Sequence, residues 1–147
     1  MWDMHKSSLG FSLLELMIAV TVVAILSMIA YPSYREHIAK SHRVEAQSAL
    51  MEISQFMEKN YTAAGTYTLP VSGSGSTLPF TTVPKNTITP SYTIALSGGN
   101  GTTTGFTVIA TRTGSMSGDR CGDFTLNQSG SRGLVNADSG ITFEQCR

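Results

Sequence analysis

Few residues of this chain have the types and the spacing that catalysis requires. The sequence contains no Gly-rich loop followed by Lys and Ser or Thr, which would hold the phosphates of a nucleotide. It also lacks a His-Glu-x-x-His zinc motif, a nucleophile elbow and a Cys-x-x-Cys pair. We therefore expect no enzyme activity, no catalytic residues and no cofactor.

Three aspartates near the C-terminus have the oxygen ligands that calcium prefers. They are Asp119, Asp123 and Asp138. Their spacing matches no calcium-binding loop, so we expect them to cap turns, and we expect no metal site.

Four arginines in the same region are a candidate patch for DNA. They are Arg112, Arg120, Arg132 and Arg147. Acidic neighbours balance their charge, and over the whole chain Lys plus Arg and Asp plus Glu both number 10, which gives a net charge of zero. A neutral chain has no general electrostatic attraction to nucleic acid. On charge alone, no nucleic-acid partner is expected.

The two cysteines, Cys121 and Cys146, are compatible either with buried free thiols or with a disulfide. The choice depends on the compartment, because disulfides persist in exported domains and are rare in the cytosol. The location of this part of the chain therefore decides between them.

Glu15 is the single acid inside an otherwise apolar run from Phe11 to Tyr31. At about 1.5 Å per residue, this run makes a helix roughly 30 Å long, which is the thickness of the hydrocarbon core of a bilayer. It is too long for the apolar core of a secretory signal peptide. An acid in hydrocarbon is costly and marks a pairing or functional site, unless it lies shallow enough to reach the headgroups.

The segment from Gly10 to Met17, with the apolar run that follows, resembles the processing signal of type IV pilins and of type II secretion pseudopilins. The family pattern is a short leader that ends in Gly, then Phe, then Glu at the fifth position after the cut. This sequence matches at Gly10, Phe11 and Glu15. Residues 60–68 and 121–130 look most like PilE-type minor pilins. Met4 is an alternative start to Met1.

The resemblance implies that a prepilin peptidase cuts between Gly10 and Phe11 on the cytoplasmic side and that Phe11 is N-methylated. It implies that Glu15 pairs with the terminal amine of a neighbouring pilin subunit during assembly. It also implies an N-terminus in the cytoplasm, an orientation that the positive residues around the run leave unspecified. The C-terminal part is then exported, and a disulfide between Cys121 and Cys146 becomes the better interpretation.

The helical pattern continues beyond Pro32, at which we expect a kink. Apolar residues recur at three- to four-residue spacing or its multiples, which predicts a stripe that packs on a sheet. They are Tyr34, Ile38, Ala46, Leu50, Ile53, Met57 and Tyr61. The charged residues are expected largely on other faces. They are Arg35, Glu36, Lys40, Arg43, Glu52 and Lys59. We predict one helix from about Phe11 to Asn60.

Prolines and glycines between residues 62 and 90 predict a long loop. Alternation then predicts four short strands. They are Ser91–Leu96, Phe106–Arg112, Cys121–Asn127 and Arg132–Asn136. The expected fold class is α+β: a long, kinked N-terminal helix packed on a four-stranded antiparallel sheet, as in type IV pilins.

The expected organisation has four parts. A leader at 1–10 precedes a transmembrane and filament-core helix at 11–31, an amphipathic half-helix at 32–61 and an exported globular region at 62–147.

The expected function is that of a minor pilin, which supports pilus biogenesis, twitching motility and adhesion. Its expected partners are other pilins, prepilin peptidase, the inner-membrane assembly platform and the membrane. It is held in the inner membrane first and on the cell surface after assembly. The alternatives are a type II secretion pseudopilin and a pilin-like adhesin or DNA-uptake component.

Overall fold

The computed structural model describes residues 10–72, 75–99 and 101–147. The expected leader therefore lies outside the described residues except for Gly10, as does Asn100 in the loop before the second expected strand. The described chain divides into two compact units, Met1–His37 and Ile38–Arg147. The four-part division expected from the sequence stays a prediction.

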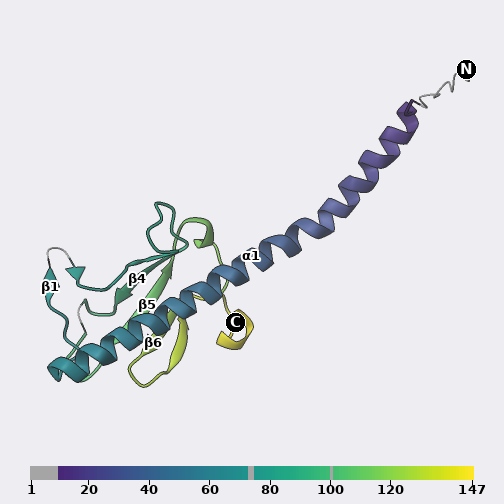
Figure 1. Ribbon diagram of the computed structural model, residues 1–147. Coiled ribbons are helices and arrows are strands. Elements are labelled where there is room, and N and C mark those ends of the chain that lie inside the picture. The colour runs from purple at the N-terminus through teal and green to yellow at the C-terminus, as the bar shows by residue number, and fades with distance from the viewer. Residues whose placement is uncertain (1–9, 73–74, 100) are drawn as a thin grey trace, which may run out of the picture. The chain divides into compact units, whose positions relative to one another are not determined.

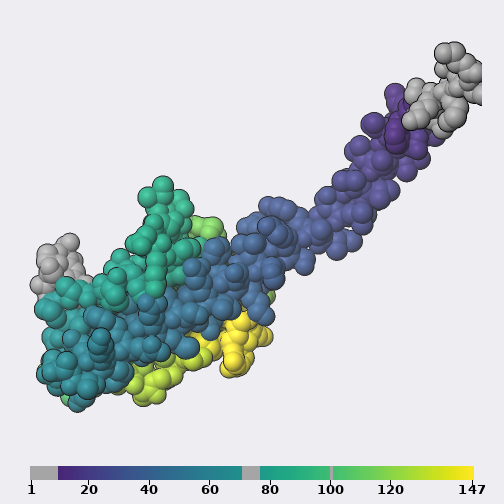
Figure 2. All heavy atoms as spheres, in the orientation of Figure 1, coloured from purple at the N-terminus to yellow at the C-terminus, as the bar shows by residue number. Residues whose placement is uncertain are grey.

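Helix α1 extends from Leu13 to Ala64 and contains Pro32. Its bounds agree with the expected helix to within a few residues at each end. The kink at Pro32 stays a prediction. In the first unit, the helical side chains are all exposed, as Figure 2 shows for the purple and violet stretch.

In the second unit, α1 lies along one face of an antiparallel sheet (Figure 1). Five strands follow one another in the order β3-β4-β5-β6-β7, each hydrogen-bonded to the next. They are Thr82–Val83, Tyr92–Leu96, Thr107–Arg112, Asp123–Asn127 and Arg132–Val135. A separate two-stranded sheet joins β1 (Val71–Ser72) to β2 (Gly75–Ser76). Short 3-10 helices are present at Gly114–Met116 (η1) and Phe143–Cys146 (η2).

The α+β class and the antiparallel order of the sheet are confirmed, but the main sheet has five strands instead of the expected four, and β1 and β2 lie where only a loop was expected. The extra strand, β3, pairs Thr82 with Thr93 and Val83 with Tyr92. It has only two residues and is followed directly by Pro84, so neither length nor alternation indicates a strand. Val83 is nevertheless buried, which explains why the sheet extends to it.

The core of the second unit combines the helix stripe with the inward faces of the strands. Ala46, Leu50, Ile53 and Met57 are all buried, as the spacing predicts. Alternate residues of the strands face them. They include Tyr92, Ile94, Leu96, Val108, Ala110, Phe124 and Leu126. The helix half and the sheet therefore hide each other's apolar faces from water, which is the main stabilising term for so small a domain.

The predicted burial along the stripe is wrong for residues at both of its ends and for one residue between them. Tyr34, Ile38 and Tyr61 are exposed by 64%, 39% and 41%. Arg43, which was expected on a polar face, is only 2% exposed. Its position explains this, because Arg43 precedes Ala46 by three residues and continues the three–four spacing of the stripe.

Candidate functional site

The residues expected to direct processing and assembly lie at the start of α1. Gly10 and Phe11 precede the helix, and the Phe11 side chain is 81% exposed. Glu15 lies in the first helical turn. A carboxylate there is favoured by the unpaired N–H groups of the helix start, which reduces the cost of an acid beside the apolar run.

The apolar run has the length and composition of a membrane-crossing helix, and it is the candidate span among the described residues. Two hydroxyl groups inside this run, those of Thr21 and Ser27, are satisfied within the helix. Thr21 Oγ1 donates to the Met17 carbonyl at 2.8 Å, and Ser27 Oγ donates to the Val23 carbonyl at 2.8 Å. Neither hydroxyl therefore needs a water or protein partner in lipid.

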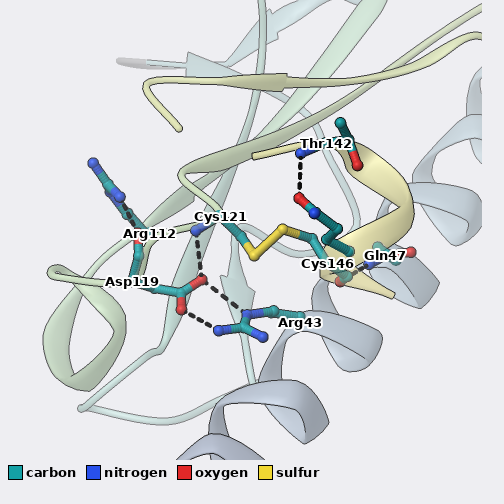
Figure 3. Close-up of a disulfide and its surroundings, with 8 residues drawn as sticks. Arg43, Gln47, Arg112, Asp119, Cys121, Thr142 and Cys146 are labelled. Atoms are coloured by element: carbon teal, nitrogen blue, oxygen red, sulfur yellow. Dashed lines mark hydrogen bonds and ion pairs between the residues drawn. A yellow bond between two sulfur atoms is a disulfide. The ribbon is translucent and has the colours of Figure 1, made fainter. Parts of the chain in front are cut away.

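In the second unit, the most buried charged side chain among the described residues is that of Arg43 on α1. It meets Asp119, from the loop before β6, in a two-pronged ion pair: Nε donates to Oδ2 at 3.0 Å and Nη2 to Oδ1 at 2.5 Å. The Asp119 side chain is 6% exposed. Asp119 Oδ2 also accepts the backbone N–H of Cys121 at 3.3 Å (Figure 3). One buried carboxylate therefore connects the helix to the loop that carries the first cysteine.

A second set of contacts holds the same loop from the sheet side. The Arg112 guanidinium donates to the carbonyl oxygens of Asp119 and Asn136. Asp123 accepts the Arg112 backbone N–H at 3.0 Å and the Asn136 side-chain amide at 2.8 Å. Charged groups here all have hydrogen-bond partners, which is the condition for burying them without a large penalty.

The disulfide joins Cys121 to Cys146 across a sequence separation of 25 residues. Both cysteines are fully buried. The Cys146 carbonyl accepts a hydrogen bond from the Gln47 side chain on α1 at 3.1 Å, and Thr142 N–H donates to Gln145 Oε1 at 3.0 Å at the start of η2. Figure 3 shows Gln47 and Thr142 on the Cys146 side of the disulfide. The bond thus attaches η2 to the β6 side, and Gln47 attaches it to the helix.

Tyr92 on β4 lies in this polar region with its ring fully buried, and its hydroxyl has no hydrogen-bond partner among the described residues. Burial, with the Asp119 carboxylate as the second cause, raises the pKa of the Tyr92 phenol far above its ordinary value of 10. The neutral form is therefore strongly preferred in the folded domain.

We expect Tyr92→Phe to change the free energy of unfolding at pH 7 by less than about 1 kcal/mol, because it removes a hydroxyl that makes no bond. Above pH 10, Tyr92 ionises in the unfolded chain but stays neutral in the folded one. The wild type therefore loses stability as the pH rises from 10. At pH 11 this loss amounts to about 1.4 kcal/mol. Urea titrations of the wild type and of Tyr92→Phe at pH 7 and pH 11 measure this loss of stability. An equal alkaline loss in the variant would contradict the assignment to Tyr92.

The three aspartates expected in turns do not converge on one point. Asp119 and Asp123 face arginine and amide donors, and no cluster of three or more His, Cys, Asp or Glu forms among residues 10–72, 75–99 and 101–147. Three of the four arginines make contacts of different kinds. Arg112 faces inward to backbone carbonyls, Arg132 lies 3.6 Å from the Met51 sulfur, and Arg147 pairs with Glu144 at 2.8 Å.

The buried ion pair is the part of this region that sequence reasoning missed. One signal was present, since Arg43 occupies a position of the apolar stripe. Its partner lies 76 positions away, in a Gly- and Ser-containing loop that has no periodicity to place it.

Two family models match this chain. Residues 5–31 match the model of the prokaryotic N-terminal methylation motif. Residues 32–125 match the family model described as type IV minor pilin ComP, DNA uptake sequence receptor. A type IV pilin of known structure from Shewanella oneidensis is 24% identical, with 71% of this chain and 97% of that chain covered and a TM-score of 0.42. A likeness of that size adds nothing to the assignment. On the two family matches, which together cover most of its length, this chain belongs to the type IV minor pilin family.

Proposed function

We propose that this chain is a minor pilus subunit that is cut between Gly10 and Phe11, methylated on Phe11 and assembled through Glu15. The observation that carries the proposal is the apolar helix of the first unit, whose side chains are all exposed. Such a surface is stable only in lipid or against other apolar helices. In the second unit, the apolar face of the helix is buried against the sheet, so this unit needs neither lipid nor another apolar helix to cover it.

The methylation motif and the apolar helix fit a pilin that is anchored in the inner membrane and later enters a pilus. The proposed partners are other pilin subunits, prepilin peptidase and the inner-membrane assembly platform. Pilus biogenesis, twitching motility and adhesion are the proposed roles, and no catalysis is assigned. The family match favours this function over that of a type II secretion pseudopilin.

We expect Glu15→Ala to reduce the amount of this subunit in sheared surface filaments at least tenfold, because the amine of a neighbouring subunit then lacks its counter-charge in an apolar medium. A tenfold loss corresponds to about 1.4 kcal/mol. Peptide mass spectrometry of filaments and membranes measures the ratio. It also shows whether peptides begin at methylated Phe11.

Glu45→Ala is the matched control, since Glu45 is an exposed acid on the same helix but in the folded unit. It should leave incorporation unchanged. Normal incorporation of Glu15→Ala, or peptides that all begin at Met1 or Met4, would contradict the proposal.

DNA reception is the second candidate, and the description of the matching family favours it. The charges do not add support, because several cations are already paired. Lys85, for example, lies 2.7 Å from a Glu52 carboxylate oxygen. Fluorescence anisotropy of labelled duplexes with the full chain in detergent tests it. A receptor binds one sequence more tightly than a scrambled duplex, and its affinity falls with salt. Equal, weak binding to both duplexes would exclude sequence recognition.

A further inference from the structure

Two tyrosines and an arginine share one face of α1 where the apolar run ends. Tyr31, Tyr34 and Arg35 follow the i, i+3, i+4 spacing that brings side chains together on a helix. The tyrosines are 63% and 64% exposed, and the Arg35 guanidinium carbon lies 6.0 Å from the centroid of the Tyr31 ring. We call these three residues the interfacial band.

We propose that the interfacial band binds the lipid headgroup layer on the outer side of the inner membrane and fixes the depth of the helix before assembly. Tyrosine is favoured at this level because its ring is apolar and its hydroxyl is polar. A guanidinium there donates to the phosphate groups of the lipids and stacks on an aromatic ring. The band thus offers both kinds of contact on one helix face.

Pro32, inside the band, supports the same depth. Proline has no N–H, so it cannot donate to the carbonyl of Met28, four residues earlier. An unpaired carbonyl costs several kcal/mol in hydrocarbon but is satisfied by water at the headgroups. The helix therefore tolerates this missing bond best where the hydrocarbon ends.

The depth of the band determines the depth of the opposite end. Twenty residues at about 1.5 Å each separate Phe11 from Tyr31, which gives about 30 Å, the thickness of the hydrocarbon core. With the band at the outer headgroups, the Gly10–Phe11 bond lies at the inner surface, where a peptidase reaches it. Glu15 then lies about 6 Å inside, within reach of the inner headgroups. This inference rests on the membrane-held state of the proposed function.

The test measures depth directly. The full chain with Val22→Cys carries one reactive thiol near the calculated mid-plane, because the two native cysteines form the disulfide. A nitroxide is attached, the protein is reconstituted in phosphatidylethanolamine and phosphatidylglycerol vesicles, and oxygen and nickel accessibilities give the depth of the label. Two triple variants are compared: Tyr31→Leu, Tyr34→Leu, Arg35→Leu, and the conservative Tyr31→Trp, Tyr34→Trp, Arg35→Lys.

We expect the label near the mid-plane in the parent and in the conservative variant. In the leucine variant it should shift by at least about 3 Å, the rise of two residues. An unchanged depth in the leucine variant, or an equal shift in the conservative one, would overturn the inference while leaving the pilin function intact. Failure of the parent chain to float with the vesicles would instead contradict the membrane-held state, and the inference with it.

Discussion

Replacing Arg43 by Met should destabilise the folded unit by about 3–5 kcal/mol, because the Asp119 carboxylate then stays buried without its cation. Both side chains are almost inaccessible, so water cannot take the place of the guanidinium. Asp119 also holds the Cys121 N–H, and its displacement loosens the disulfide loop. Urea unfolding of the unit Ile38–Arg147, followed by circular dichroism, measures the loss.

The exposed ion pair between Lys85 and Glu52 provides the control. Its side chains are 48% and 52% exposed, and exposed pairs contribute only about 0–1 kcal/mol. Lys85→Met should therefore change stability little. Removing both buried partners, as Arg43→Met with Asp119→Leu, should recover much of the loss, because no unpaired charge remains. A double variant as unstable as Arg43→Met would show that the charge is not the cause.

Loss of the disulfide should have an effect of similar size. Closing a loop with a separation of 25 residues is expected to stabilise the fold by about 3–4 kcal/mol in the chain-entropy model. Cys121→Ala with Cys146→Ala removes this constraint and releases η2 from β6. Denaturant midpoints with and without a phosphine reductant measure the difference.

The double variant also controls for effects of the reductant other than cleavage of the disulfide. A chain without cysteines should unfold at the same denaturant concentration with and without the reductant. Both sulfur atoms are buried, so reduction of the wild type should be slow until the domain opens. An equal midpoint for the wild type and the double variant would show that noncovalent contacts, such as the Gln47 hydrogen bond and the packing of Phe143 on Phe124, are sufficient to hold the C-terminal segment.

Patterns with a short period in sequence predicted the fold well. The spacing of Ala46, Leu50, Ile53 and Met57 indicated the buried helix face, and alternation indicated β4 and β5 to within a residue. Each of these signals lies within one element. The extra strand β3 has two residues, too few for alternation to appear, and it forms only because Val83 and Tyr92 pair across the sheet edge.

The polar region under the disulfide could not be derived in the same way. The burial of Arg43 was detectable from its register with the apolar stripe. The choice of Asp119 as its partner depends on how the loop after η1 folds back, and neighbouring residues do not encode that. The residues at 10, 11 and 15, in contrast, form a local motif, and it was visible at once, although their roles stay predictions.

The long-range contacts of α1 have a consequence for the order in which the domain forms. Arg43 pairs with a residue 76 positions later, and Gln47 bonds to one 99 positions later. Strands β4 to β7 pair with sequence neighbours, and such local pairing is fast, whereas closure over long separations is slow. During export, the apolar stripe of the helix half therefore stays uncovered until the last strands have crossed. In that interval the uncovered apolar stripe makes the chain prone to aggregation.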